Sequence, residues 1–187
     1  SGNKAVLHIF GTGTTPDILT RHYLWQHKLD YTLNYSFTTA QEIMQGILAG
    51  KIDHAVLGEP FLNIALRKDS TLNILADLNR PDSASSGFAQ TAILYAPTLE
   101  KNRKTIDSLL TLSCRFAVEQ PELAIQILEK ENIFVPGMLT PESIKRCKID
   151  YKTASEAQEN ILRFLQLIKQ YEPKALGGKM PDEKFYK

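Results

Sequence analysis

Three strand-like segments, each followed by a helix-like one, occupy the first 66 residues and constrain the fold more than any other feature. Residues 5–10 and 52–57 are short apolar runs, and residues 31–37 are rich in aromatic side chains. Each run leads within a few residues into apolar positions spaced as in a helix. Short connections between alternating strands and helices favour a parallel sheet with helices on its faces. We therefore predict an α/β lobe over residues 1–96.

Local signals mark where two of these helices begin. Thr15 is a favourable N-cap residue, Pro16 suits the first helical position, and Asp17 complements the positive end of the helix dipole. Thr39 and Glu42 have the spacing of a capping box, which opens the second helix. Both helix starts are thus predicted from the local sequence.

The second half of the chain has a different character. Residues 72–75 and 91–95 indicate two more strands, separated by a loop rich in Pro, Asp, Ser and Gly. Beyond them, residues 97–187 are predicted to be helical, and the last helix carries a broad apolar stripe of the kind that packs on a core. The four predicted helix starts are Thr98, Pro121, Thr140 and the capping-box pattern from Ser155 to Gln158.

Charge and hydropathy exclude several classes of partner. The chain has 22 Lys and Arg residues against 21 Asp and Glu residues, so no global field attracts nucleic acid or an anionic membrane. No apolar run approaches the roughly 18 residues of a membrane span, and the N-terminus lacks a signal-peptide pattern. Because residues 1–2 resemble the remnant of a cleaved tag, we expect the chain to be an excised piece of a longer protein.

No group of residues nominates a catalyst. No serine lies in a G-x-S-x-G elbow, the four histidines are scattered, and the acids form no motif with a paired base. Cys114 and Cys147 share no metal-type spacing with the histidines. They are interpreted as two partly buried thiols, and their pairing stays open. We predict that the chain is not an enzyme and holds neither a metal nor a cofactor.

The glycine-rich turn at residues 11–15 is the first candidate binding element. It combines flexible backbone, three hydroxyl groups and the N–H groups of a helix N-terminus, which suit an anionic group or a polar ring edge. It lacks the third glycine of a dinucleotide fingerprint and the lysine of a P-loop. The alternative is an ordinary strand-to-helix turn with a threonine cap.

Two more candidates follow the next two predicted strands. The hydroxyl and aromatic side chains of residues 36–39 flank a ligand or only cap a helix. Glu59 follows the third strand, and glutamate is a poor N-cap residue, so a functional carboxylate is favoured over a solvated one. Open α/β sheets bind ligands beyond the carboxyl ends of their strands. We expect the three candidates to converge at that edge.

Four motifs in order resemble one family. Residues 50–60 (GKIDHAVLGEP) resemble a G-x-I/V-D-x-A-V-x-x-E-P stretch of substrate-binding proteins of ABC importers. That group is the type II periplasmic-binding-protein class, which includes nitrate, sulfonate, taurine and thiamine-pyrimidine-precursor binders. The turn at residues 11–13 precedes the stretch at the family's distance. Residues 89–94 resemble the crossing between lobes, and residues 177–186 resemble a G-G-K-x-P-D-x-x-F-Y terminus.

The resemblance implies a solute-binding protein, or its second lobe with the C-terminal helices, that hands a small polar or aromatic solute to a membrane permease. Such proteins begin with a β/α lobe that has no counterpart here, so residues 97–187 would pack partly on that missing lobe and the isolated chain would self-associate. It also implies a periplasmic or extracytoplasmic protein, lipid-anchored in the parent. The residues expected to bind the ligand are Thr12, Gly13, Thr14, Ser36, Phe37, Thr38, Glu59 and Gln90.

Two alternative functions share this architecture. Ligand-sensing effector domains of LysR-like regulators resemble it, and a DNA-binding segment in the parent would favour that hypothesis, whereas a lipoprotein signal would favour transport. Enzymes related to pyrimidine-precursor synthases also resemble it, but they depend on histidine and metal chemistry that this sequence does not show.

Overall fold

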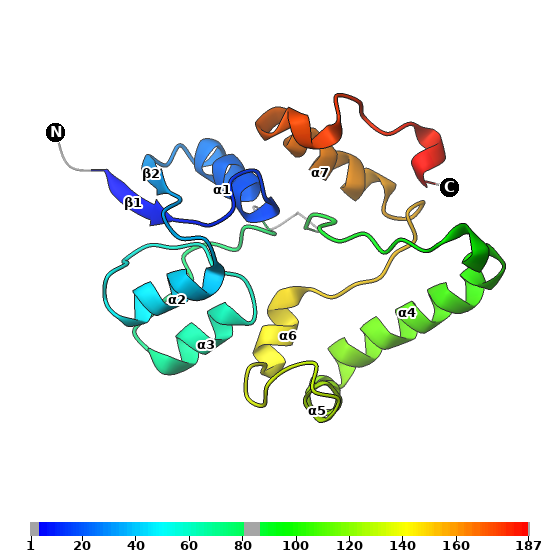
Figure 1. Ribbon diagram of the computed structural model, residues 1–187, viewed down its shortest axis with the longest axis horizontal. Coiled ribbons are helices and arrows are strands. Elements are labelled where there is room, and N and C mark those ends of the chain that lie inside the picture. The colour runs from blue at the N-terminus through cyan, green and yellow to red at the C-terminus, as the bar shows by residue number, and fades with distance from the viewer. Residues whose placement is uncertain (1–3, 81–86, 187) are drawn as a thin grey trace.

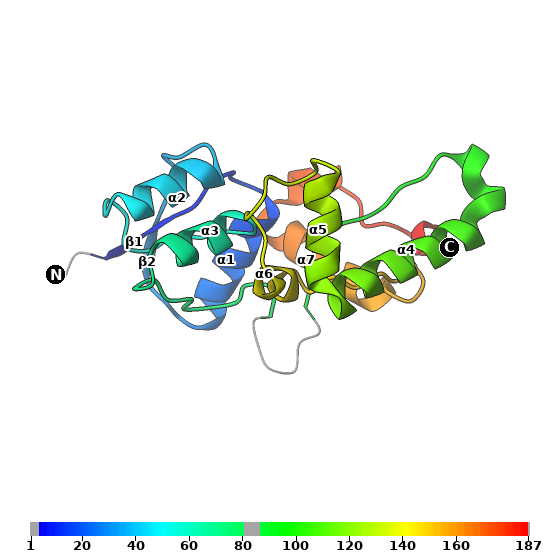
Figure 2. The ribbon, with the colours of Figure 1, turned by 90° about the horizontal axis from the view of Figure 1, so that it is seen from below.

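The computed structural model describes residues 4–80 and 87–186, which form a mixed α/β structure. Figures 1 and 2 show the two strands and the first three helices at one end of the long axis and helix α4 towards the other end. The strands and α-helices in chain order are β1 (Ala5–His8), α1 (Thr15–Gln26), β2 (Tyr31–Asn34), α2 (Ala40–Leu48), α3 (Phe61–Lys68), α4 (Arg103–Glu119), α5 (Pro121–Lys130), α6 (Pro141–Cys147) and α7 (Gln158–Tyr171). Short 3₁₀ helices lie at Pro97–Asn102, Pro173–Leu176 and Glu183–Tyr186.

The sheet is small and parallel. Strands β1 and β2 pair in a register that sets His8 opposite Asn34. The predicted third strand is reduced to one parallel bridge, between His8 and Ala55. The expected fold class is confirmed, because a parallel α/β unit is followed by a helical segment.

The two later strands that we predicted are wrong. Residues 72–75 and 91–95 form no regular element and pair with no strand among the described residues, and Leu75 and Leu94 are 76% and 88% exposed. Their β-branched and apolar composition gives strand propensity, but a strand needs a neighbour to form its ladder. These segments therefore keep the sequence character of strands without the pairing.

Three predicted helix starts shift and three are correct, among them Pro121, the first residue of α5. The capping box of Thr39 and Glu42 forms as predicted, and Thr140 caps α6 through the amide of Ser143. The N-cap position of α1 is Thr14, one residue before the predicted Thr15, and its side chain makes no capping hydrogen bond; a 3₁₀ turn precedes α4.

The predicted capping box of Ser155 and Gln158 is wrong. The reciprocal hydrogen bonds join Thr153 and Glu156 instead: the Thr153 hydroxyl donates to the Glu156 carboxylate at 2.7 Å, and the Glu156 amide donates to that hydroxyl at 3.4 Å. This box closes a turn before the helix, so α7 begins only at Gln158. The sequence contains two overlapping S/T-x-x-E/Q patterns, Thr153–Glu156 and Ser155–Gln158, offset by two residues. The pattern alone does not show which of the two forms the capping box.

The main hydrophobic core joins the two ends of the chain. Helix α7 lies against α1, as Figure 1 shows, and the core between them is formed by the buried residues Ile18, Leu19, Phe88, Phe164 and Leu167. The predicted packing of the apolar stripe of the last helix is thereby confirmed. A second cluster, formed by Ile125, Leu139 and Ile144, holds α5 to α6.

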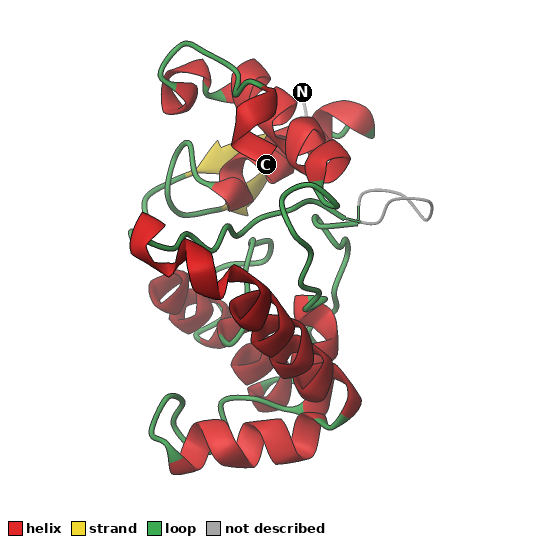
Figure 3. Ribbon diagram, turned by 90° about the vertical axis from the view of Figure 1, so that its right-hand side faces the viewer, coloured by secondary structure: helices red, strands yellow, loops and turns green. Residues whose placement is uncertain are grey.

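Helix α4 is poorly covered by comparison. None of its residues is buried, and Leu109 and Leu112 remain 61% and 60% exposed. Figure 3 shows that the strands lie in one part of the molecule and that helices make up the rest. The helices α4 to α6 are thus a separate group, joined to the α/β part by the segments 89–96 and 148–157.

Candidate functional site

A buried carboxylate organises the glycine turn between β1 and α1. Asp17 is fully buried, and one of its oxygens accepts hydrogen bonds from the Gly13 amide and the Arg21 guanidinium, both at 2.8 Å. Its other oxygen accepts the hydroxyl proton of Tyr35 at 2.6 Å. Asp17 lies in the first turn of α1, where the helix dipole favours negative charge. One side chain therefore fixes the turn, the helix and the end of β2, a role that the sequence analysis missed.

The end of α7 closes over the same turn. Arg21 donates to the carbonyl oxygen of Tyr171 at 3.1 Å and lies over the Tyr171 ring, 5.3 Å from its centroid. The next residue, Glu172, approaches Gly13 so closely that a Cβ there would lie 3.2 Å from the Glu172 Cγ. Gly13 also has a φ of +78°, a left-handed conformation that favours glycine. Glu172 thus joins the candidate site.

The ionisation of Tyr35 reports on this network. Burial, reinforced by the hydrogen bond to Asp17 and its charge, raises the pKa of Tyr35 from 10.0 to about 12. Because the folded state holds this proton more tightly, the resulting stabilisation is complete below pH 10 and is lost as the pH rises to about 12. We expect the near-ultraviolet absorbance of wild type, after subtraction of the Tyr35→Phe titration, to show the ionisation of Tyr35 with a midpoint near pH 12. A midpoint near 10 would contradict the hydrogen bond.

The segment after β2 is used mainly as a helix cap. The Glu42 carboxylate accepts the amide proton of Thr38 at 2.8 Å and its hydroxyl proton at 2.9 Å, and these bonds lower the pKa of Glu42. The Ser36 amide donates to the Asn34 side chain at 2.8 Å, which leaves the Ser36 side chain exposed. Phe37 packs edge-on against the ring of His8, and the two bonds from Thr38 to Glu42 favour the capping alternative for this segment.

Glu59 forms a second cluster at the junction of α3 and α6. One carboxylate oxygen lies 2.5 Å from the Arg146 Nε, and the other accepts the Asn63 amide at 3.1 Å, which satisfies a free N–H of the first turn of α3. The side chain is only 10% exposed. The expectation that helix chemistry does not explain Glu59 is therefore wrong, because the carboxylate caps α3 from outside the N-cap position.

Other polar contacts strengthen this junction. Asn63 donates to the carbonyl of Met138 at 3.0 Å and accepts the Thr140 hydroxyl at 2.9 Å. Arg67 donates to the carbonyl of Gly137 at 2.7 Å, and Lys148 pairs with Asp77. The helical group α4 to α6 is thus held on the α/β part by side chains of α3.

We predict that replacing Glu59 lowers the free energy of unfolding of the chain, whether or not it also weakens ligand capture. Glu59→Ala removes an ion pair and a capping acceptor, so we expect about 1–2 kcal/mol less unfolding free energy in a urea titration. The matched control is Glu119→Ala, which breaks an exposed pair with Arg115 and should cost less than about 0.5 kcal/mol. Weakened solute capture with unchanged stability would instead assign Glu59 a purely functional role.

The three parallel segments place the candidates at one edge. Because β1, β2 and the bridge at Ala55 run in the same direction, residues 11–15, residues 36–38 and Glu59 all follow carboxyl ends of the sheet. The hydrogen bonds of the Asp17 cluster and the Glu59 cluster share no residue. The predicted ligand residues that are exposed are Thr12, Thr14, Ser36, Thr38 and Gln90, and those that are partly buried are Gly13, Phe37 and Glu59. Their binding role stays a prediction.

Two hollows lie away from these residues. One, of about 780 Å³, lies beside α1 and β2 and is lined by Arg21, Leu24, Trp25, Gln26, Lys28, Leu29, Tyr31 and Leu33. The other, of about 270 Å³, is lined by His22, Gln26, Phe88, Arg163, Gln166, Leu167 and Gln170. Neither hollow is lined by a predicted ligand residue, so the predicted ligand residues lie at the edge of the sheet and outside both hollows.

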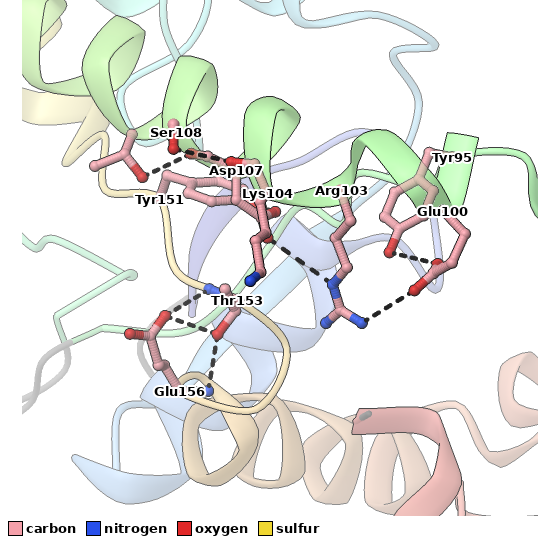
Figure 4. A network of polar contacts seen from close by, with 10 residues as sticks. Tyr95, Glu100, Arg103, Lys104, Asp107, Ser108, Tyr151, Thr153 and Glu156 are labelled. Atoms are coloured by element: carbon pink, nitrogen blue, oxygen red, sulfur yellow. Dashed lines mark hydrogen bonds and ion pairs between the residues drawn. The ribbon is translucent and has the colours of Figure 1, made fainter.

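A third polar network anchors α4 to the two connecting segments, as Figure 4 shows. Asp107 accepts the hydroxyl proton of Tyr151 at 2.6 Å, which raises the pKa of Tyr151 to about 12. Arg103 lies 3.7 Å from the Glu100 carboxylate, which accepts the Tyr95 hydroxyl at 3.2 Å. This network ties one end of α4 to both connections.

Three further observations concern the described residues alone. Cys114 and Cys147 are both free thiols; Cys114 is partly buried as predicted, but Cys147 is exposed, so the prediction of a partly buried thiol is wrong there. Within residues 4–80 and 87–186, no three His, Cys, Asp or Glu side chains are grouped as they are around a metal ion. No helix of these ranges has the length and apolar character needed to cross a membrane.

The comparisons with known proteins give one informative match. No family model and no curated protein matches the sequence. A crystal structure of an ABC transporter from Parabacteroides distasonis, at 1.75 Å resolution, is 56% identical in sequence and superposes with a TM-score of 0.94. The match covers 99% of this chain and 66% of that chain. The chain is therefore related to a component of an ABC transporter, and it spans just under two thirds of its length.

Proposed function

We propose that the chain is the solute-binding component of an ABC importer, or an excised lobe of one, which captures a small polar or aromatic solute for a membrane permease. The observation that carries the proposal is the 56% identity to an ABC transporter over 99% of this chain. The motif at residues 50–60 supports the binding role, because it contains Glu59, which follows the carboxyl end of the third parallel segment.

The finer assignment follows the same resemblance. We place the chain in the type II class, in the group that binds nitrate, sulfonate, taurine and thiamine-pyrimidine precursors. The parent protein would then be periplasmic or extracytoplasmic and lipid-anchored, and it would not be an enzyme.

We also propose that residues 1–96 carry half of the ligand cleft and that residues 97–187 pack partly on a lobe outside this chain. The unpaired segments 72–75 and 91–95 support this proposal, since both expose apolar side chains. The uncovered leucines of α4 support it as well. About a third of the related chain lies outside the match, which is consistent with such a lobe.

The test combines binding with transport. Ligand-observed NMR, which detects weak binding, identifies solutes that bind the chain from a panel of small polar and aromatic compounds. Uptake of each bound solute is then measured in cells with and without the gene for the parent protein. We expect uptake of at least one bound solute to require the gene. Equal uptake in both cell lines for every bound solute would contradict the importer role.

A further inference from the structure

We propose that the solute at the carboxyl edge of the sheet carries no net negative charge and presents N–H donors, as an amine, amidine or amide does. This inference rests on the proposed function, because it names the chemical class of the ligand of that site. Its basis is how the donors and charges of the edge are already used within the chain.

The donors of Gly13 and Thr14, in the middle of the glycine turn, are already bonded within the chain. The amide of Gly13 donates to the buried carboxylate of Asp17. The amide and the hydroxyl of Thr14 both donate to the carbonyl of Gly11, at 3.0 and 2.6 Å. Pro16, in the first turn of α1, has no N–H. An anion at this helix N-terminus would therefore find a carboxylate of the chain in its place.

The other two segments of the edge are closed in the same way. Glu42 accepts the amide and hydroxyl protons of Thr38 and, at 3.3 Å, the amide proton of Thr39. Glu59 accepts the amide of Asn63. In each of the three segments, at least one backbone donor is bonded to a side-chain carboxylate. An incoming anion would have to displace that carboxylate and then remain beside it.

The charges at the edge point the same way. Arg21 pairs with Asp17, and Arg146 pairs with Glu59. Glu42 and Glu172 have no basic partner among the described residues. Two unpaired carboxylates leave the edge with a negative potential, which disfavours nitrate or sulfonate and favours a cation or a neutral donor.

Glu172 is the acceptor best placed for such a solute. It is partly buried, lies against Gly13, and its carboxylate makes no hydrogen bond or ion pair with a described residue. A carboxylate accepts N–H donors through both oxygens and forms stronger hydrogen bonds than a neutral acceptor. A solute with N–H donors would supply the partners that this carboxylate lacks.

The test uses three probes of one shape and three charges: benzamidine, benzamide and benzoate. Each is titrated to about 20 mM, far beyond the micromolar range of tight binding, into the ¹⁵N-labelled chain, and the amide shifts of Gly11, Gly13 and Thr14 are followed. We expect saturable shifts with benzamidine and weaker ones with benzamide, and none with benzoate. In Glu172→Gln the dissociation constant of benzamidine should rise about threefold to fivefold, the effect of one exposed ion pair. The control Glu159→Gln removes the same charge from the other end of α7 and should leave it unchanged.

The outcomes separate the two proposals. Binding of benzoate at these amides, as tight as that of benzamidine or tighter, overturns the charge inference and leaves the solute-binding function standing. An unchanged dissociation constant in Glu172→Gln overturns the role of Glu172 as the acceptor. If none of the three probes shifts these amides while the chain stays folded, the site itself is misplaced, and the inference falls with it.

Discussion

Asp17→Ala should lower the free energy of unfolding by about 3–4 kcal/mol, because it removes a fully buried carboxylate and leaves several partly buried polar groups without this acceptor. The amide of Gly13, the hydroxyl of Tyr35 and the guanidinium of Arg21 all lose the acceptor that orients them. The loss is a large part of the 5–15 kcal/mol that stabilises a typical domain. Urea unfolding followed by circular dichroism measures it.

A matched acid provides the control. Asp30 pairs with Lys4 at 2.8 Å, but the two side chains are 70% and 59% exposed, so Asp30→Ala should cost less than about 1 kcal/mol. Equal losses in the two variants would show that the buried network does not stabilise the turn between β1 and α1.

The second large effect concerns the isolated chain in solution. We expect it to self-associate, because extensive apolar surface is uncovered on α4 and on the segment 91–95, and to bind solutes only weakly, at millimolar concentrations. Light scattering over a range of concentrations measures the association, and calorimetry measures solute binding. A compact monomer that binds a sulfonate, nitrate or pyrimidine at micromolar affinity would overturn the interpretation of the chain as one lobe.

Substitutions locate the surface that causes this association. Leu94→Lys and Leu112→Lys place charges at two of the exposed apolar positions and should shift the chain towards monomer. Thr111→Lys adds the same charge to α4 at a neighbouring exposed position that is not apolar, and it should leave the association unchanged. Association that resists both leucine substitutions would place the contact elsewhere, for example at the exposed Trp25.

Features encoded within a few residues were predicted well from the sequence. The alternation of strands and helices gave the parallel α/β class, and the capping box of Thr39 and Glu42 forms as its spacing indicates. Segments that depend on a distant neighbour were predicted less well. Residues 91–95 have the composition of a strand, but no partner strand is present in the described chain.

The candidate site shows the same division. The pair of Asp17 and Arg21 is visible in the sequence as neighbours on one helix turn, but Tyr35 lies 18 residues away from Asp17, and Tyr171 lies 150 residues from Arg21. Arg146 is 87 residues from Glu59, so its ion pair changed the interpretation of a carboxylate that appeared unexplained. Spacing along the chain carries no information on such contacts before the fold is known.

The packing of α7 on α1 has a consequence for biosynthesis. The core that covers Ile18 and Leu19 includes Phe164 and Leu167, so the apolar face of α1 is buried only after α7 has been synthesised. Ribosomes add roughly 5–20 residues per second, and domains usually fold as units in the order of their synthesis. Here the first strands and helices emerge many seconds before the residues that bury them, and during that interval their apolar faces remain open to chaperones or to neighbouring nascent chains.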